Sequence, residues 1–245
     1  MGSEMCIRDS STVELNSTHY GTPSHETIAK WREAVPDGFV FCPKVLQRIS
    51  HSKDLSLGQE WLNQFCKAIL GMGSSLGCSF MQLPPYFKIE KLSLLERFLD
   101  QFPKEIPLAV ELRHESWFSN EHNFTALFDL LEAKGISSVI TDVAGRRDVL
   151  HQRLTTDTAM LRWVGNGLHP TDYERIDAWI LRLKEWHTLG LRKAYIFLHE
   201  PDNLLAPEIV AYFARQANAI LGVNLVVPNL TERNKEVNPN QMSLF

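Results

Sequence analysis

The chain has 245 residues, of which 44% are hydrophobic and 22% charged, and its formal net charge is -4 at pH 7. This length suits one α/β domain, and the acidic balance excludes a global attraction to nucleic acid or anionic membranes, leaving only local basic patches. No apolar run reaches the roughly 20 residues of a membrane span, and no secretory signal is visible. Four cysteines without paired or metal-type spacing predict reduced thiols in a cytoplasmic protein.

Composition divides the chain into three segments. Residues 1–11 are polar and lack periodicity, so we interpret them as a non-native or unstructured leader. Residues 12–228 carry regular hydrophobic patterns and form the predicted barrel domain. Residues 229–245 turn polar again, which is typical of a mobile C-terminal tail.

Short apolar strands alternate with helical stripes along the predicted domain. The expected strands are 12–16, 39–44, 78–83, 108–112, 138–142, 159–164 and 194–199. The first expected helix is capped by Ser24 and carries Ile28 and Trp31 on one face. About seven strands in alternation with helices predict parallel βα units. We therefore expect an α/β fold, a TIM-type (β/α) barrel that lacks one unit at its N-terminus.

Polar side chains lie at the end of most predicted strands. These residues are Glu14, Asn16, Lys44, Gln82, Glu111, Arg113, His114, Asp142, Arg162, His199 and Glu200. In a parallel barrel the C-terminal strand ends converge on one face, which we call the mouth, and active sites lie there. The densest group spans residues 109–118, where ionisable side chains adjoin Trp117. Charges are rarely buried without partners, so this crowding predicts a pocket.

Each of these residues has a structural alternative. Glu14 and Arg162 would also form an ion pair inside the mouth, and Lys44 would also serve as a solvated strand end. His114 would cap the following loop, and Asp142 would form an Asx turn. Ligand-type side chains are spread over several strand ends, but no local motif such as H-E-x-x-H joins them. We predict no metal site, and the sequence identifies no cofactor.

Several segments, in order and spacing, resemble the YecE-like family (domain of unknown function 72). They are residues 14–20, 39–44, 49–51, 82–85, 110–118, 161–165 and 195–199. The resemblance runs from about Thr12 to Gly222 and implies a TIM-type barrel without naming a reaction. Family members usually begin with a strand carrying a Gly and a Trp-x-Tyr stretch, which this chain does not show. They often have Phe where this chain has His19, and paired Asn where it has His199 and Glu200.

Two functional hypotheses follow. In the first, an enzyme acts on a phosphate-containing substrate such as a sugar phosphate or a phosphodiester, an assignment made by analogy with other barrels. Its predicted catalytic residues are Glu14, Glu111, His114 and Asp142, with Glu14 or Glu111 as general base. Its predicted substrate-binding residues are Asn16, Tyr20, Lys44, Gln82, Arg113, Trp117, Arg162 and His199. In the second, a non-catalytic module holds a nucleic-acid backbone, aided by Arg146, Arg147 and Arg153.

The tail ends in Gln241-Met-Ser-Leu-Phe245. This sequence resembles the short motif with which bacterial proteins bind the DNA sliding clamp. Leu244 and Phe245 are apolar residues at the end of a polar segment, and such a pair suits a partner's pocket. A chance match, or Phe245 packing on the barrel, explains the same five residues. With Gln241, Leu244 and Phe245 as partner-binding residues, the motif predicts recruitment to the clamp.

Overall fold

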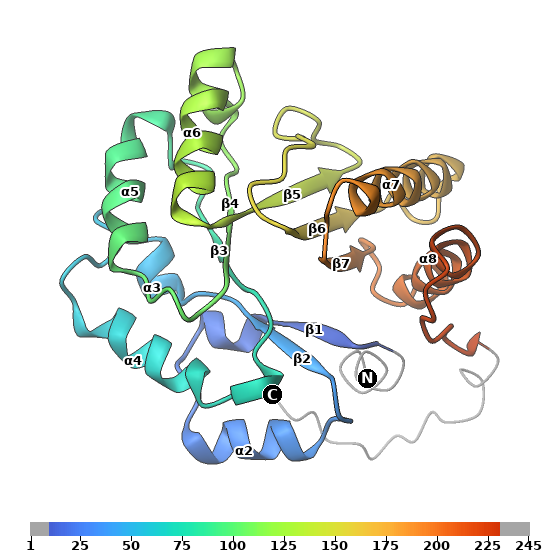
Figure 1. Ribbon diagram of the computed structural model, residues 1–245, viewed down its shortest axis with the longest axis horizontal. Coiled ribbons are helices and arrows are strands. Elements are labelled where there is room, and N and C mark those ends of the chain that lie inside the picture. Colours follow the sequence, from blue (N-terminus) through green and yellow to red (C-terminus); the bar gives the residue numbers. More distant parts are fainter. Residues whose placement is uncertain (1–9, 231–245) are drawn as a thin grey trace. The chain divides into compact units, whose positions relative to one another are not determined.

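The computed structural model describes residues 10–230, which contain seven β-strands and seven α-helices (Figure 1). The strands are β1 (Thr12–Leu15), β2 (Val40–Pro43), β3 (Ser79–Gln82), β4 (Leu108–Glu111), β5 (Ser137–Val143), β6 (Thr158–Val164) and β7 (Lys193–His199). The helices are α2 (His25–Glu33), α3 (Gln47–Ser50), α4 (Glu60–Leu70), α5 (Leu92–Gln101), α6 (Glu121–Lys134), α7 (Pro170–Thr188) and α8 (Ala206–Leu221). Each expected strand is present in this part of the chain.

Local sequence fixes the ends of several helices. The Ser24 hydroxyl accepts a hydrogen bond from the Thr27 N–H at the start of α2, which confirms the predicted cap. Asn120 caps α6 in the same way, and Gly135 ends that helix in the left-handed conformation with φ 67°. At α7, Pro170 occupies the first turn behind the cap residue His169.

The strands form two sheets. β1 pairs in parallel with β2, and the second sheet has the order β3-β4-β5-β6-β7. Only isolated parallel bridges, between Phe41 and Leu76 and between Lys44 and Phe80, join β2 to β3. Pro43 has no N–H to donate at this point, which interrupts the ladder. The expected α/β fold is thus present as a curled parallel five-stranded sheet and a small two-stranded sheet.

The described residues group into two compact units, and the single barrel domain over 12–228 stays a prediction. One unit comprises residues 11–163 and 191–197, which include β1 to β5 and most of β6 and β7; the other comprises residues 164–190 and 198–230, with the last residues of β6 and β7. In the first unit, strand side chains of β2 to β7 meet in one apolar cluster, as expected on the inner face of a curled sheet. Its members are Cys42, Cys78, Phe80, Ala109, Val139, Met160 and Phe197.

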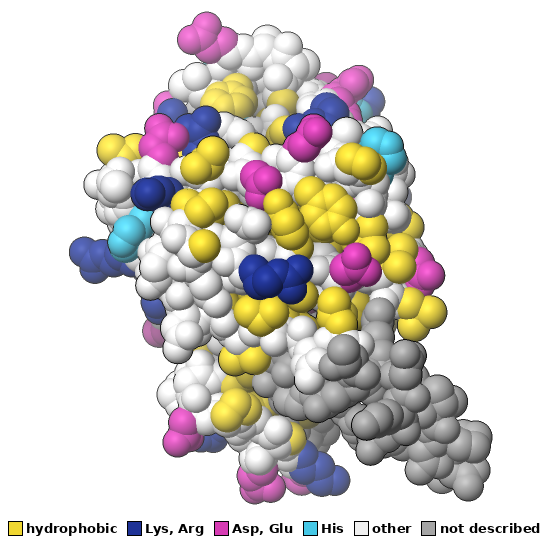
Figure 2. All heavy atoms as spheres, turned by 90° about the vertical axis from the view of Figure 1, so that its right-hand side faces the viewer, with side chains coloured by type: hydrophobic (Ala, Val, Ile, Leu, Met, Phe, Trp, Pro, Cys, Tyr) yellow, Lys and Arg dark blue, Asp and Glu magenta, His cyan; other side chains and the backbone are white. Residues whose placement is uncertain are grey.

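The second unit is built on α7 packed against α8. The rings of Tyr173 and Tyr212 meet edge to face at 4.8 Å, and the Tyr212 hydroxyl donates to the Asp177 carboxylate at 2.9 Å. Figure 2 shows apolar side chains interspersed with charged ones on the face that it presents. The exposed apolar residues of this unit are Leu181, Leu189, Leu204, Val223, Leu225, Val226 and Val227.

The thiols of Cys42, Cys66 and Cys78 are free and buried. Burial raises the pKa of Cys42 and of Cys66 to about 12, so both remain protonated and unreactive at neutral pH. No helix among residues 10–230 combines the length and apolarity needed to cross a membrane.

Residues 1–9 and 231–245 lie outside the described residues. The proposed leader therefore falls almost wholly outside them. So do Gln241, Leu244 and Phe245, and recruitment to the sliding clamp stays a prediction.

Candidate functional site

Two carboxylates and one guanidinium form the centre of the first unit's mouth. Glu111 at the end of β4 is 1% exposed, and Glu14 on β1 is also buried. Arg162 on β6 contacts both: Nε donates to Glu14 Oε1 at 2.5 Å and Nη1 to Glu111 Oε2 at 2.8 Å. A second bond, from Nη2 to Glu14 Oε2 at 3.1 Å, makes the Glu14 contact bidentate. We call these three residues the Arg162 cluster.

The positive charge of Arg162 allows the carboxylates of Glu14 and Glu111 to be buried together. Burial by itself lowers the pKa of Arg162, but the attraction of Glu111 and Glu14 outweighs it and raises that pKa above its ordinary value. The ion pair considered as a structural alternative for Glu14 is therefore present, extended to Glu111. Because its fork is occupied by two carboxylates, Arg162 offers little charge to a ligand.

Lys44 extends the cluster towards solvent through an amide. Its Nζ donates to Gln82 Oε1 at 2.9 Å, and Gln82 Nε2 donates to Glu111 Oε1 at 2.7 Å. The β3–β4 register places Gln82 opposite Glu111. Burial lowers the pKa of the Lys44 ammonium, and Arg162 acts in the same direction. The ammonium is half-buried and bonded to a neutral oxygen rather than to a carboxylate.

Arg113 and His51 lie beside Lys44. The Arg113 side chain is 38% exposed, and its Nε is 3.8 Å from Glu111 Oε1, too far for a hydrogen bond. Burial lowers the pKa of His51, and the charges of Lys44 and Arg113 lower it further. His51 is therefore a neutral imidazole that faces two cations. Three cations and two carboxylates leave one net positive charge at this edge, carried by Lys44 and Arg113.

His19 is a further imidazole at the same edge. Its Nδ1 donates to the Val45 carbonyl oxygen at 2.8 Å, and its ring meets that of His51 edge to face at 5.5 Å. Burial lowers the pKa of His19, and Lys44 adds to this effect. The described strand ends thus bring together a polar network with two neutral histidines beside it.

Other predicted site residues have local roles. His114 Nδ1 accepts from the Ser116 N–H at 3.0 Å, so His114 caps the short helix η4 (Glu115–Trp117). Asp142 pairs with Arg147. Trp117 is fully buried, stacks on Phe87 and donates its indole N–H to the Phe87 carbonyl at 2.7 Å. This placement gives Trp117 a packing role, and we leave it out of the proposed site.

Asn16 is exposed at the start of the short helix η1 (Asn16–His19). Its predicted contact with substrate stays a prediction.

The three arginines predicted to hold a nucleic-acid backbone are each paired with a carboxylate. Arg146 contacts Asp148 at 2.6 Å, Arg147 contacts Asp142, and Arg153 contacts Glu132 at 3.0 Å. These pairs reduce the positive charge that the segment presents to an anion.

His199 belongs to the second unit, where its carbonyl oxygen accepts from the Gly165 N–H at 2.9 Å. The adjacent Glu200 is buried, and its Oε2 accepts from the Gly167 N–H at 2.9 Å. Burial raises the pKa of Glu200, and Asp172 adds to this effect. The Gly167 N–H of the glycine-containing loop 165–167 is thus already engaged by this carboxyl group.

Gly165 leaves no room for a side chain beside Glu200. A Cβ at this position would lie 2.2 Å from Glu200 Oε1. We expect Gly165→Ala to lower the thermal unfolding midpoint by several degrees, because the buried carboxyl group must move away from its backbone donors. Gly145→Ala is the matched control, since its Cβ would meet no atom within 4 Å. Equal midpoints for both variants would contradict this packing.

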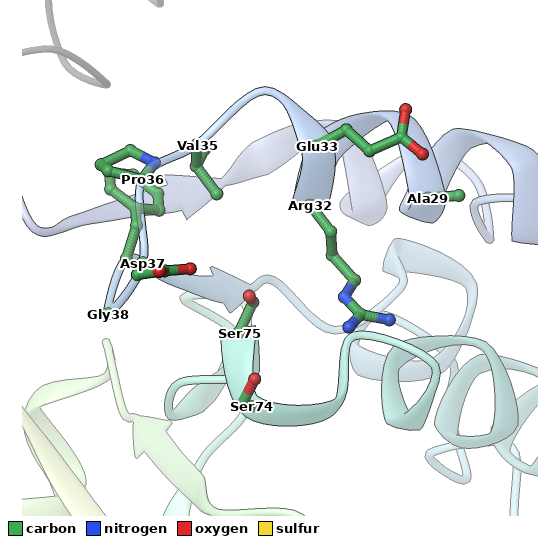
Figure 3. Close-up of a pocket in the computed structure, with 10 residues that line it drawn as sticks. Ala29, Arg32, Glu33, Val35, Pro36, Asp37, Gly38, Ser74 and Ser75 are labelled. Carbon is green, nitrogen blue, oxygen red and sulfur yellow. The ribbon is translucent and has the colours of Figure 1, made fainter.

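A separate hollow of about 420 Å³ lies away from the mouth (Figure 3). Residues 35–39 before β2 line it together with Arg32 of α2 and Ser74 and Ser75 before β3. It therefore adjoins the N-terminal ends of β2 and β3, opposite to the strand ends that carry the Arg162 cluster.

No group of three or more His, Cys, Asp or Glu side chains within residues 10–230 is arranged to hold a metal ion.

The fold is that of an α/β protein of the DUF72 class. The family model "Protein of unknown function DUF72" matches residues 7–232, and the chain belongs to this family. It is 31% identical over 260 residues to "UPF0759 protein YecE" of Escherichia coli K12, covering 99% of this chain and 92% of the relative. The same identity and coverage hold for the protein of that name from strain O157:H7.

Two solved structures support the fold alone. A DUF72 family protein of Enterococcus faecalis V583 superimposes with a TM-score of 0.73 at 19% identity, covering 91% of this chain and 93% of that one. A DUF72 family protein of Thermotoga maritima MSB8 gives a TM-score of 0.63 at 24% identity, covering 87% of this chain and 85% of that one.

Tyr86 was missed by the reasoning from sequence. It follows Pro84-Pro85 at the end of β3, is 59% exposed, and donates from its hydroxyl to the His51 carbonyl oxygen at 3.2 Å. An aromatic residue directly after a strand-ending Pro-Pro pair was the available signal. His51 lies in one of the segments that resemble the family, but it was not among the predicted site residues.

Proposed function

We propose that the protein binds a phosphate-containing ligand at the mouth of the first unit, with Lys44 and Arg113 as the anion contacts. The observation that supports this proposal is that the half-buried Lys44 ammonium is bonded to a neutral amide. Within residues 10–230, the carboxylate that lies nearest to Arg113 is that of Glu111, at 3.8 Å. An anion with several acceptor oxygens would satisfy both cations. We further infer that the two sheets belong to an incomplete TIM-type barrel, whose C-terminal face suits such a ligand.

His51 is the proton acceptor that the geometry favours if the bound ligand reacts. Its imidazole is neutral because burial, Lys44 and Arg113 lower its pKa, and a neutral imidazole can take up a proton. Glu14 and Glu111, predicted as general bases, are both engaged by Arg162. The catalytic roles predicted for Glu14, Glu111, His114 and Asp142 stay proposals. In the site proposed here, the Arg162 cluster positions Gln82, which in turn positions the Lys44 ammonium.

Lys44→Met tests the anion site. We expect affinity for inorganic pyrophosphate, measured by isothermal titration calorimetry, to fall roughly 10- to 150-fold, because a charge-assisted hydrogen bond contributes about 1.5–3 kcal/mol. Affinity for the wild type should also fall as ionic strength rises. Lys30→Met on the exposed face of α2 makes the same change in charge and should leave affinity within about twofold. Indistinguishable affinities for the two variants would refute the proposed site.

A further inference from the structure

We infer that the phosphate ligand of the mouth carries an aromatic base, being a nucleotide or a nucleotide unit of a single strand that stacks on Tyr20 or Tyr86. This inference rests on the proposed function and names the class of its ligand.

Two uncovered tyrosines carry the inference. Among the Phe, Tyr and Trp side chains of residues 10–230, only Tyr20 at 81%, Tyr86 at 59% and Trp61 at 38% are exposed. The Trp61 ring is already covered by the Arg48 guanidinium, 4.2 Å from its centroid. Tyr20 and Tyr86 therefore present the largest open aromatic surfaces in this part of the chain.

The two tyrosines are joined by the two histidines of the mouth. The rings of Tyr20 and His19 meet edge to face at 5.4 Å, and those of His19 and His51 at 5.5 Å. Tyr86 donates to the His51 carbonyl oxygen. We call these four residues the aromatic strip. Its members lie in the segments that directly follow β1, β2 and β3, so the ends of three strands, from both sheets, position them.

The aromatic strip lies beside the proposed anion contacts. Lys44 acts on the pKa of both His19 and His51, and Arg113 acts on that of His51. The Thr18 hydroxyl, two residues before Tyr20, donates to the Lys44 carbonyl oxygen at 2.7 Å. Cations next to open aromatic faces are the arrangement with which proteins hold phosphates and stack bases at the same time. An inorganic phosphate or a simple sugar phosphate has no base to place on these rings.

Binding of matched ligands tests the inference. The probes are inorganic pyrophosphate, ribose 5-phosphate, adenosine 5′-monophosphate and a five-nucleotide oligodeoxyadenylate. We expect the wild type to bind the mononucleotide about 5- to 150-fold more tightly than ribose 5-phosphate, the gain from stacking one base. The double variant Tyr20→Ala/Tyr86→Ala should lose this preference and keep its affinity for pyrophosphate.

Controls separate stacking from other effects. Tyr20→Phe/Tyr86→Phe keeps both rings and should retain the preference, and Trp61→Ala should leave it unchanged. An unchanged thermal unfolding midpoint shows that the exposed substitutions do not unfold the protein. An oligonucleotide that binds more tightly than the mononucleotide identifies a single strand as the ligand, and equal affinities identify a free nucleotide; both results support stacking.

One outcome would contradict the inference alone, and another would contradict the proposed function as well. If pyrophosphate binding depends on Lys44 but the wild type shows no preference for the nucleotide, the inference is overturned and the anion site stands. If the wild type binds none of the four probes, the proposed function fails together with the inference.

Discussion

Replacing Arg162 by Met is expected to lower the free energy of unfolding by about 3–5 kcal/mol, as in other proteins when one partner of a buried ion pair is removed. Glu14 and Glu111 are both buried, so the substitution would leave two carboxylates in the interior without their shared cation. Urea unfolding followed by circular dichroism measures the change.

The same substitution at an exposed ion pair provides the control. Arg182 on α7 contacts Glu185 with Nη1 2.6 Å from Oε2, at a solvent-exposed position. Arg182→Met should change stability by less than about 1 kcal/mol, because solvent screens surface pairs. If both variants lost the same small amount, Arg162 would not be the charge that holds the mouth together.

Acid is expected to destabilise the protein through His151, which lies between the rings of Phe118 and Phe128. Its Nε2–H donates to the Val139 carbonyl oxygen at 3.1 Å, and its Nδ1 accepts from the Arg153 N–H at 3.3 Å. In the neutral ring both nitrogens have a hydrogen-bond partner. A second proton would be on Nδ1 and would point at the Arg153 N–H. Burial lowers the pKa of His151 from 6.5 to about 4.

The sign of the pH effect follows from the protons bound in each state. Between about pH 6.5 and 4 the unfolded chain binds a proton at His151 that the folded protein does not. The neutral ring contributes about 3 kcal/mol to the free energy of unfolding. This contribution is fully present above pH 6.5 and is lost as the pH falls towards 4.

His151→Gln removes this titration and keeps one donor and one acceptor. We expect the variant to be less stable than the wild type at pH 8, because the Gln side chain does not reproduce the shape of the imidazole. Its unfolding free energy should then fall less steeply between pH 6.5 and 4. The difference between the two curves isolates His151 from His19, His51 and Glu200, which titrate in both proteins. Parallel curves would show that His151 does not carry the acid sensitivity.

The strands were predictable because each is a short apolar run bounded by turn residues, as in 108–111 before the charged stretch. The helices were predictable from caps such as Ser24 and from apolar stripes. The break between β2 and β3 was not predicted, although Pro43 marks it. A count of strands does not show where pairing is interrupted, because a proline removes one of the N–H donors on which a ladder depends.

The site was predicted as a set of strand-end residues but not as a network. Alternation along neighbouring strands places Gln82 beside Glu111 and so explains their contact. The pairing of Arg162 with Glu14 joins residues 148 positions apart, and strand-end position alone left both an ion pair and a ligand contact open. The exposure of Tyr86 was not predicted, because the exposure of a single aromatic residue depends on the surrounding loops, which local patterns do not define.

The most direct test of the anion site is a crystal of the protein soaked in tungstate, an analogue of phosphate, with the tungsten located by anomalous scattering. The proposed function predicts a peak within hydrogen-bonding distance of Lys44 Nζ and the Arg113 guanidinium, and its loss in Lys44→Met crystals soaked in the same way. Tungstate bound only at other surfaces, or an equally strong peak in the Lys44→Met crystals, would contradict it.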